Sequence, residues 1–410
     1  MPLVFVLFVF FILHIQGLVR FLVFGTDETT YYGMTAHYLY SRQVAAESLL
    51  FSFACASAFA IGYILLHRGK DHTHDNLDVE VDLKPYRLEL RLLYATGMLQ
   101  ILTNLVLVVI SRLDYVEIVS IKYNYSFPFQ SRVVFLVLVA HLLLNIPLKQ
   151  LWRRRNLRLA RWLIATYLLL TILLQFRSEI FEIAFIVAFA WLMWAGDRIK
   201  VKYVLVMVSS LLVPNLIVLG RLGFPSDPAQ LVQGLFSFEY STIFNNILSE
   251  AISRGKEVGG GLTFLPQLAL IIPSPVRALF GINALEPDYF SSLTSAAGVL
   301  GGGFSFLGEM YSNFGWFGPL VVGMLGMLIG RVIAQAGRVG RVPMLYAVAP
   351  LLYVDFILVF RNDFAVFLKS AIQLFIVAIL IDFARRLRLI CTKWKVEGEL
   401  DQIPTVRVAE

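Results

Sequence analysis

The stretch GGGFSFLGEMYSNFGW, residues 301–316, runs without a break into an apolar segment that ends near residue 334. About 20 consecutive apolar residues suffice for a helix to cross the hydrocarbon core of a bilayer. The stretch therefore marks the place where a less apolar segment enters a membrane. Residues 221–311, which lead up to it, form the only long segment between apolar runs that is not itself a clean span. We expect the remaining chain to be a membrane scaffold that holds this segment at one surface.

The composition agrees with a membrane protein. Of the 410 residues, 58% are hydrophobic and 15% are charged, which is too apolar for a soluble domain. Repeated apolar runs predict an all-α, polytopic helical membrane protein with about ten transmembrane helices and one large outer loop. The net charge of +7 does not indicate nucleic-acid binding, because most basic residues lie in short loops between these runs. Cys55 and Cys391 are the two cysteines and supply no disulfide framework.

The distribution of basic residues predicts the topology. Ten spans are expected, near residues 3–24, 46–66, 90–111, 131–148, 157–176, 179–195, 202–220, 312–334, 343–360 and 364–384. With ten spans, every basic cluster falls on one side, at residues 68–91, 149–161, 198–202, 338–341 and 385–395. The positive-inside rule then places both termini in the cytoplasm. The N-terminus lacks a basic n-region and a small-residue cleavage site, so we expect a retained helix.

Four parts follow from this topology: helices 1–7 (residues 1–220), a large outer loop (221–311), helices 8–10 (312–384) and a cytoplasmic tail (385–410). The tail is expected to be disordered after Lys395. Within the loop, residues 230–254 have apolar side chains at helical spacing, which predicts an amphipathic helix on or against the membrane. Residues 262–272 are apolar but too short to span, and prolines interrupt them. We expect a re-entrant or interfacial segment there, beside a cavity open to the bilayer.

From Arg177 onward, five arginines lie at or near the predicted outer face, where the positive-inside rule expects few cations: Arg177, Arg221, Arg254, Arg277 and Arg361. Earlier in the chain, the same side carries only scattered cations, such as Arg42, Arg112, Lys122 and Arg132. Arg177 and Arg361 occupy very short turns between two spans. One interpretation is a snorkelling arginine, or an ion pair with Glu179 or Asp363. The other is capture of a phosphate or pyrophosphate by the planar guanidinium fork. Both interpretations stay open at this point.

Among the acidic residues, Glu309 stands apart because it follows a glycine run and directly precedes a membrane helix. A partly desolvated carboxylate there could act as a general base on a sugar hydroxyl, or it could interact with the N-terminus of the next span. Asp27 and Glu28 form an acidic pair in the first outer loop, as in many lipid-linked sugar transferases. Tyr311 belongs to an aromatic group beside the glycines, which could be an interfacial belt or a platform for sugars.

Other chemistry has little support in the sequence. No spacing of histidine, cysteine and acidic residues resembles a metal site, and no phosphate-binding loop or nucleophile elbow occurs. We therefore expect neither a metal nor a cofactor. Most histidines lie in predicted spans or on the cytoplasmic side, and only His37 is expected outside.

The motif at residues 301–315 resembles that of bacterial O-antigen polymerases (Wzy-type oligosaccharide repeat-unit polymerases). Members carry a similar glycine-rich run, then an acid, a tyrosine and Asn-Phe-Gly before a late membrane helix. The layout of spans and the single large periplasmic loop are similar too. The resemblance implies an enzyme of the inner membrane that transfers a growing glycan from undecaprenyl pyrophosphate to a sugar hydroxyl of the next lipid-linked repeat unit. It also implies membrane lipid and a chain-length regulator protein as partners.

By this resemblance, Glu309 is the candidate catalytic residue, and Arg177 and Arg361 are candidate substrate-binding residues. Arg221, Arg277 and Tyr311 complete the candidate substrate-binding set. No counterpart of the paired arginine-containing, glycine-rich motifs of some members is evident in this chain.

Three alternative functions stay open. An O-antigen ligase would use the same donor, but a histidine is expected in its large loop and none is present. A transferase that uses a polyprenyl-phosphate sugar is supported only by Asp27 and Glu28. A transporter or flippase is suggested by Asp355 and Lys369 within spans, although two related halves are not evident in the sequence.

Overall fold

The computed structural model describes residues 2–24, 28–31, 34–66, 81–111, 117, 127–174, 176–195, 240–255, 272, 279–280, 305–336, 342–359 and 364–400. These residues are helical apart from short connections and one antiparallel hairpin, in which β1 (Glu28–Tyr31) pairs with β2 (Met34–His37). The register sets Glu28 opposite His37 and Tyr31 opposite Met34. The predicted helical fold class is confirmed, and the hairpin is an addition that the sequence analysis missed.

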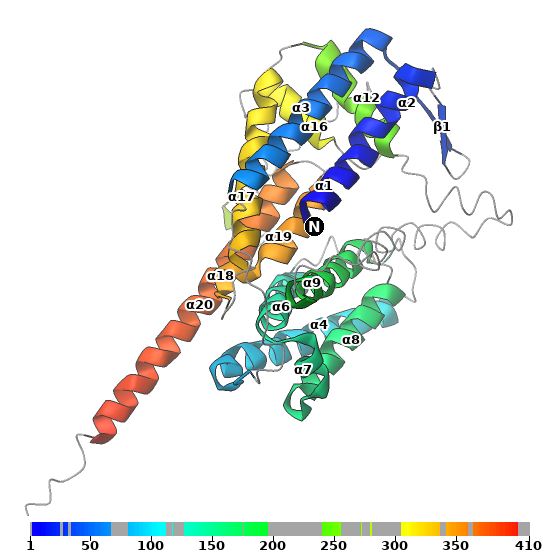
Figure 1. Cartoon of the computed structure of the whole chain (residues 1–410). Coiled ribbons are helices and arrows are strands. Elements are labelled where there is room, and N and C mark those ends of the chain that lie inside the picture. Colours follow the sequence, from blue (N-terminus) through cyan, green and yellow to red (C-terminus); the bar gives the residue numbers. More distant parts are fainter. Residues whose placement is uncertain are drawn as a thin grey trace, which may run out of the picture.

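The helices follow the apolar runs (Figure 1). The first half contains α1 (Pro2–Phe10), the π-helical segment η1 (Phe11–Ile15), α2 (Gln16–Phe24), α3 (Arg42–Leu66), η2 (Lys84–Tyr86), α4 (Arg87–Ser111), α6 (Phe127–Asn145), α7 (Leu148–Arg153), η3 (Arg155–Leu157), α8 (Arg158–Leu173) and α9 (Arg177–Ala195). The second half contains α12 (Tyr240–Ser253), α16 (Phe306–Phe314), η6 (Gly315–Phe317), α17 (Gly318–Ala336), α18 (Met344–Ala347), α19 (Ala349–Val359) and α20 (Phe364–Leu400).

Within the described residues, five helical segments are long and apolar enough to cross a membrane: Arg42–Leu66, Lys84–Ser111, Arg155–Leu173, Phe306–Ala336 and Phe367–Arg388. Shorter apolar helices cover Leu13–Val23, Ser131–Asn145, Glu182–Trp191 and Met344–Ile357. All of these segments coincide with predicted spans. The predicted span 202–220 and most of the large loop, including residues 262–271, lie outside the described residues. The chain therefore has the helices of a membrane protein, whereas the number of ten spans stays a prediction.

Two predictions are corrected by the structure. Within the predicted amphipathic segment, α12 is helical, but Phe244, Ile247 and Leu248 are fully buried by other helices instead of facing lipid. The reason is that α3, α16 and η1 cover its apolar face. The tail is helical as far as Leu400, because α20 continues beyond the membrane-length segment (Figure 1). Ion pairs from Arg385 and Arg386 to Asp382, each 2.8 Å long, lie near the end of the membrane-length segment, before the helix continues to Leu400.

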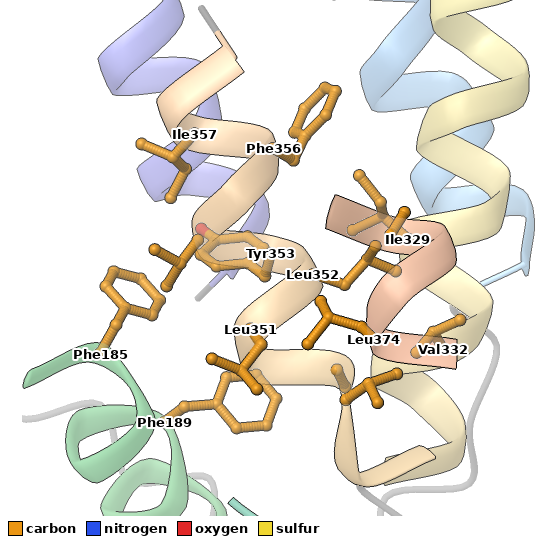
Figure 2. Close-up of a cluster of buried hydrophobic side chains, with 14 of the residues drawn as sticks. Phe185, Phe189, Ile329, Val332, Leu351, Leu352, Tyr353, Phe356, Ile357 and Leu374 are labelled. Atoms are coloured by element: carbon orange, nitrogen blue, oxygen red, sulfur yellow. The ribbon is translucent and has the colours of Figure 1, made fainter. Parts of the chain in front are cut away.

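Helix α19 connects two groups of helices. It contacts α9 and α6 on one side and α17 and α20 on the other. Figure 2 shows Phe185 and Phe189 of α9 directed toward α19, with Ile329 of α17 and Leu374 of α20 on its opposite side. Tyr353, at the centre of α19, is fully buried. The packing of α19 therefore fixes α9 and α20 relative to each other, which matters for the site below.

Helices α3 and α17 touch through glycines. A Cβ atom added to Gly62 of α3 would lie 2.0 Å from the carbonyl oxygen of Gly323. A Cβ atom added to Gly326 of α17 would lie 2.3 Å from the carbonyl oxygen of Phe59. Both contacts are with backbone, so a side chain could enter only if the helices moved apart. Small residues allow such close approach of helices in membranes.

Gly326→Ala is expected to lower the free energy of unfolding by about 1–3 kcal/mol, because overpacking forces the two backbones apart. Chemical unfolding in detergent would measure this loss. Met324→Ala on the same helix is the control, since Met324 is 63% exposed and packs on little. Parent-like stability of Gly326→Ala would show that α3 and α17 do not pack this closely.

Candidate functional site

A buried group of charged side chains lies where α9 begins and α8 ends. The guanidinium of Arg132 on α6 contacts two carboxylates of α9, with Nη1 3.0 Å from Glu179 Oε1 and Nη2 2.7 Å from Glu182 Oε1. The hydroxyl of Tyr167 on α8 donates to Glu179 Oε2 over 3.1 Å. Glu179 and Glu182 are almost completely buried. This group thus ties three helices together by charged hydrogen bonds.

The spacing of these residues explains the contact. Glu179 and Glu182 are three residues apart on a helix, so both carboxylates point from the same face. The planar fork of Arg132 can bind both at once, which a lysine could not do with the same geometry. Removing such charges from water is costly, and the cost is offset only when each charge is paired and hydrogen-bonded.

Asp355 of α19 extends the group toward α20. Its Oδ2 accepts a hydrogen bond from the hydroxyl of Ser370, and it lies close enough to Arg132 for the two charges to interact. The guanidinium of Arg132 thus contacts two carboxylates, and a third lies nearby. Ionisable residues at membrane depth commonly mark a pathway or a binding site. We call Arg132, Tyr167, Glu179, Glu182 and Asp355 the charged cluster.

Glu309 lies on α16, in which residues 306–313 are all buried. Ser305 caps the helix by accepting a hydrogen bond from the backbone nitrogen of Gly308, 3.2 Å away. Glu309 is completely buried, and its Oε2 accepts a hydrogen bond from the backbone nitrogen of Phe364, the first residue of α20. The expected interaction with a helix N-terminus is therefore present, but the helix is α20 and not the span that follows Glu309. A role for Glu309 as a base stays a prediction.

The structure places the other predicted residues as follows. Arg177 is the first residue of α9, two positions before Glu179. Arg361 lies outside the described residues, in the connection between α19 and α20, and Arg221 and Arg277 also lie outside them. The site thus has Glu309 at the start of α20, with Arg361 only three residues earlier in the chain. The charged cluster joins the start of α9 to α19.

Tyr311 is 7% exposed and packs edge-to-face on Phe51 and Trp316, with ring centroids 5.1 and 6.3 Å apart. It is therefore part of an aromatic cluster inside the protein, and its face is not presented to a sugar in this structure. Of the acidic pair in the first loop, Asp27 lies outside the described residues and Glu28 begins β1.

Arg254 forms an ion pair within the protein, which is one of the two interpretations given above for the arginines. Its Nε lies 2.6 Å from Glu250 Oε1, one turn earlier on α12. Glu250 also accepts a hydrogen bond from the hydroxyl of Tyr40, 2.7 Å away. Burial alone would raise the pKa of Glu250, but the bonds from Tyr40 and Arg254 hold it below its usual value. The stabilisation from Glu250 is accordingly present at neutral pH and is lost as the pH falls through its pKa in the folded protein.

Helix α12 is held to the first loop by further hydrogen bonds. The hydroxyl of Tyr38 lies 2.5 Å from Ser249 Oγ, which lies 2.8 Å from Ser48 Oγ on α3. Burial raises the pKa of Tyr38 to about 12, so it stays protonated at physiological pH. The backbone nitrogen of Leu39 donates to Asn246 Oδ1. These contacts fix α12, on which the buried α16 with Glu309 rests.

Arg132 is the candidate site residue that the sequence analysis missed. Only arginines from Arg177 onward were considered there as site residues. The available signal was the pair Glu179 and Glu182, three residues apart at the start of an apolar helix. Two carboxylates on one face of a membrane helix require a cation or a proton nearby.

No protein-family model, curated protein or solved structure matches this chain. Among the residues that the structure describes, no three histidine, cysteine, aspartate or glutamate side chains are grouped so that they could hold a metal ion. The chemistry available to the described site is therefore that of carboxylates, a guanidinium and a phenol. These groups suit proton transfer and the binding of a charged or hydroxylated ligand.

Proposed function

We propose that this protein is a glycosyltransferase that joins undecaprenyl-pyrophosphate-linked oligosaccharide repeat units into O-antigen or a related surface polysaccharide. The reaction would occur at the periplasmic face of the bacterial inner membrane, with both termini in the cytoplasm. The observation that carries the proposal is the stretch of residues 301–316. Its sequence resembles that of repeat-unit polymerases, and its acid, Glu309, accepts a hydrogen bond from Phe364, three residues after Arg361 in the chain.

In the proposed reaction, a hydroxyl oxygen of the acceptor repeat unit attacks the anomeric carbon of the donor glycan. The bond between this carbon and the pyrophosphate oxygen breaks, and undecaprenyl pyrophosphate leaves with the electron pair. A base takes the hydroxyl proton. Because pyrophosphate is already a good leaving group, the reaction requires neither a nucleotide sugar nor an obligatory metal.

We assign Glu309 as this base, and Arg177, Arg361, Arg221 and Arg277 as candidate contacts for the pyrophosphate. Guanidinium groups stabilise the charge that develops on the leaving oxygens. Arg132 is a positioning residue in this scheme, since it holds Glu179 and thus the start of α9, where Arg177 lies. For Glu309 to reach a hydroxyl, the start of α20 must move from the carboxylate that it covers. A chain-length regulator is a further proposed partner.

A transporter of lipid-linked glycans is the second candidate, and the charged cluster favours it. Paired carboxylates and a guanidinium buried among apolar helices, with a third carboxylate nearby, are common along the substrate and ion pathways of transporters. Such a protein would move the lipid-linked unit without forming a glycosidic bond. The formation of polymer from purified components therefore separates the two functions, and it would also separate polymerase from ligase, which needs a different acceptor.

Arg177→Lys and Arg361→Lys are each expected to abolish most surface polymer in cells, because lysine keeps the charge but loses the bidentate fork. Gel analysis of the polysaccharide would show single repeat units at normal protein abundance. Arg254→Lys is the control, because Arg254 already pairs with Glu250. Full tolerance of lysine at both positions would identify them as snorkelling residues and move the pyrophosphate site to Arg221 or Arg277.

A further inference from the structure

A pocket of about 580 Å³ opens between the segment before α4 and the turn from α7 to α8. It is lined by Val81, Asp82, Leu83, Lys84, Arg87, Leu90, Arg154 and Asn156. Its volume lies in the range of small-ligand sites. Neither the charged cluster nor the proposed reaction uses this pocket.

The walls of the pocket are held by hydrogen bonds between the two segments. Arg154 Nη1 donates to the carbonyl oxygen of Val81, and the backbone nitrogen of Val81 donates to Gln150 Oε1 over 3.2 Å. Asp82 Oδ1 accepts from the backbone nitrogen of Lys84, which starts η2. The guanidinium of Arg154 is thereby fixed at one wall, and Lys84 is positioned at the other.

The pocket is basic. Lys84, Arg87 and Arg154 line it against a single acid, Asp82. Lys84 and Arg87 are exposed and form no ion pair within the part of the chain that the structure describes. Further exposed cations on the adjoining turn are Lys149, Arg153, Arg155 and Arg158. An anion would therefore be attracted to the pocket from solution or from a membrane surface.

The pocket also has an apolar side. Val81, Leu83 and Leu90 line it beside the cations. Met98 follows Arg87 by eleven residues, which is about three turns of a helix, so the two residues lie on the same face of α4. This face continues as an exposed apolar stripe: Met98 is 57% exposed, Leu102 60% and Val109 75%. The cations could bind an anionic head group, and the apolar stripe along this membrane-length helix could contact the acyl chain attached to that head group.

We propose that this pocket binds the phosphate of an anionic membrane lipid, with phosphate held by Lys84, Arg87 and Arg154 and an acyl chain along the stripe on α4. Basic pockets between transmembrane helices on the cytoplasmic side commonly bind phosphate head groups. Two exposed tryptophans on the same segment, Trp152 and Trp162, are typical of the membrane interface. A free phosphate shares the head-group chemistry but not the acyl chain.

The test compares lipid binding to the full-length protein by native mass spectrometry in detergent, with phosphatidylglycerol and phosphatidylcholine as probes. The double variant Lys84→Gln, Arg87→Gln should bind phosphatidylglycerol about 30-fold more weakly. This follows from up to about 1 kcal/mol for each ion pair with the phosphate that is lost, and a factor of ten for each 1.4 kcal/mol. The control is Arg153→Gln, Arg155→Gln, which removes the same charge from exposed positions outside the pocket, and its affinity should stay within about 3-fold of the parent.

Each outcome decides the proposal. The proposal is supported if the parent prefers phosphatidylglycerol, the Lys84→Gln, Arg87→Gln variant loses this preference, and the Arg153→Gln, Arg155→Gln control keeps it. Equal losses in both double variants would reduce the effect to surface potential and overturn the site, as would equal binding of both lipids by the parent. Competition by inorganic phosphate at the same concentrations as the lipid would overturn the lipid assignment and leave a site for free phosphate. Thermal unfolding of all variants shows that they are folded.

Discussion

Glu309→Gln is expected to lower polymer formation by about 10²–10⁴-fold, the usual contribution of a general base. Lipid-linked repeat units should accumulate in cells that carry this variant. The structure makes the substitution informative, because glutamine has nearly the same volume and its amide oxygen can still accept the hydrogen bond from Phe364. The variant thus removes the charge and keeps most of the packing and the contact with α20. Rates of polymer formation at matched protein abundance would measure the effect.

A helix-capping role alone gives a different result. Loss of the charge at the N-terminus of α20 would then cost about 1 kcal/mol of stability or less, and activity would be kept. Ser305→Ala is the matched control, because it removes the cap of α16 at a cost of about 1 kcal/mol without touching the carboxylate. An active Glu309→Gln together with an inactive Asp27→Asn would move the chemistry to the first loop and favour the monosaccharide transferase.

Arg132→Met is expected to destabilise the protein by about 3–5 kcal/mol, because it leaves the buried carboxylates of Glu179 and Glu182 without their cation. Chemical unfolding in detergent would measure this loss. The triple variant with Glu179→Gln and Glu182→Gln should recover most of the stability, since Asp355, which also accepts a hydrogen bond from Ser370, is then the one carboxylate of the cluster without its cation. Arg254→Met is the control, because its pair with Glu250 is partly exposed and contributes at most about 1 kcal/mol.

The triple variant also tests the positioning role of Arg132. It should be folded yet make little polymer, because the start of α9 is no longer fixed by the guanidinium. A stable triple variant with full activity would show that the charged cluster serves only the fold. An unstable triple variant would show that Arg132 makes contacts beyond these two carboxylates.

The positions of the helices could be predicted because the length of an apolar run is a local property of the sequence. The surroundings of a helix are not local. The apolar face of α12 looks the same whether it meets lipid or other helices, and only the packing of α3 and α16 shows that it is buried. The helical end of α20 was missed because charged residues that favour helices also resemble a solvated tail.

Single residues of the site could be predicted from the sequence, but their partners in the folded protein could not. The unusual setting of Glu309 was evident from its neighbours, but its partner Phe364 is 55 residues away. Arg132 and Glu179 are 47 residues apart, and helical periodicity does not reveal which faces of two spans meet. Arg254 looked like Arg177 in the sequence, and only the structure shows that it pairs on its own helix.

The central claim is that this protein forms glycosidic bonds between lipid-linked repeat units. The most direct measurement is to incubate purified protein with undecaprenyl-pyrophosphate-linked repeat units, without nucleotide sugar, and to separate the products by size. We expect a ladder of lengths, with release of undecaprenyl pyrophosphate for each bond formed and no ladder from Glu309→Gln. Folded protein that leaves the repeat units at their original size would contradict the claim, and their movement across a vesicle membrane in the same sample would identify a transporter.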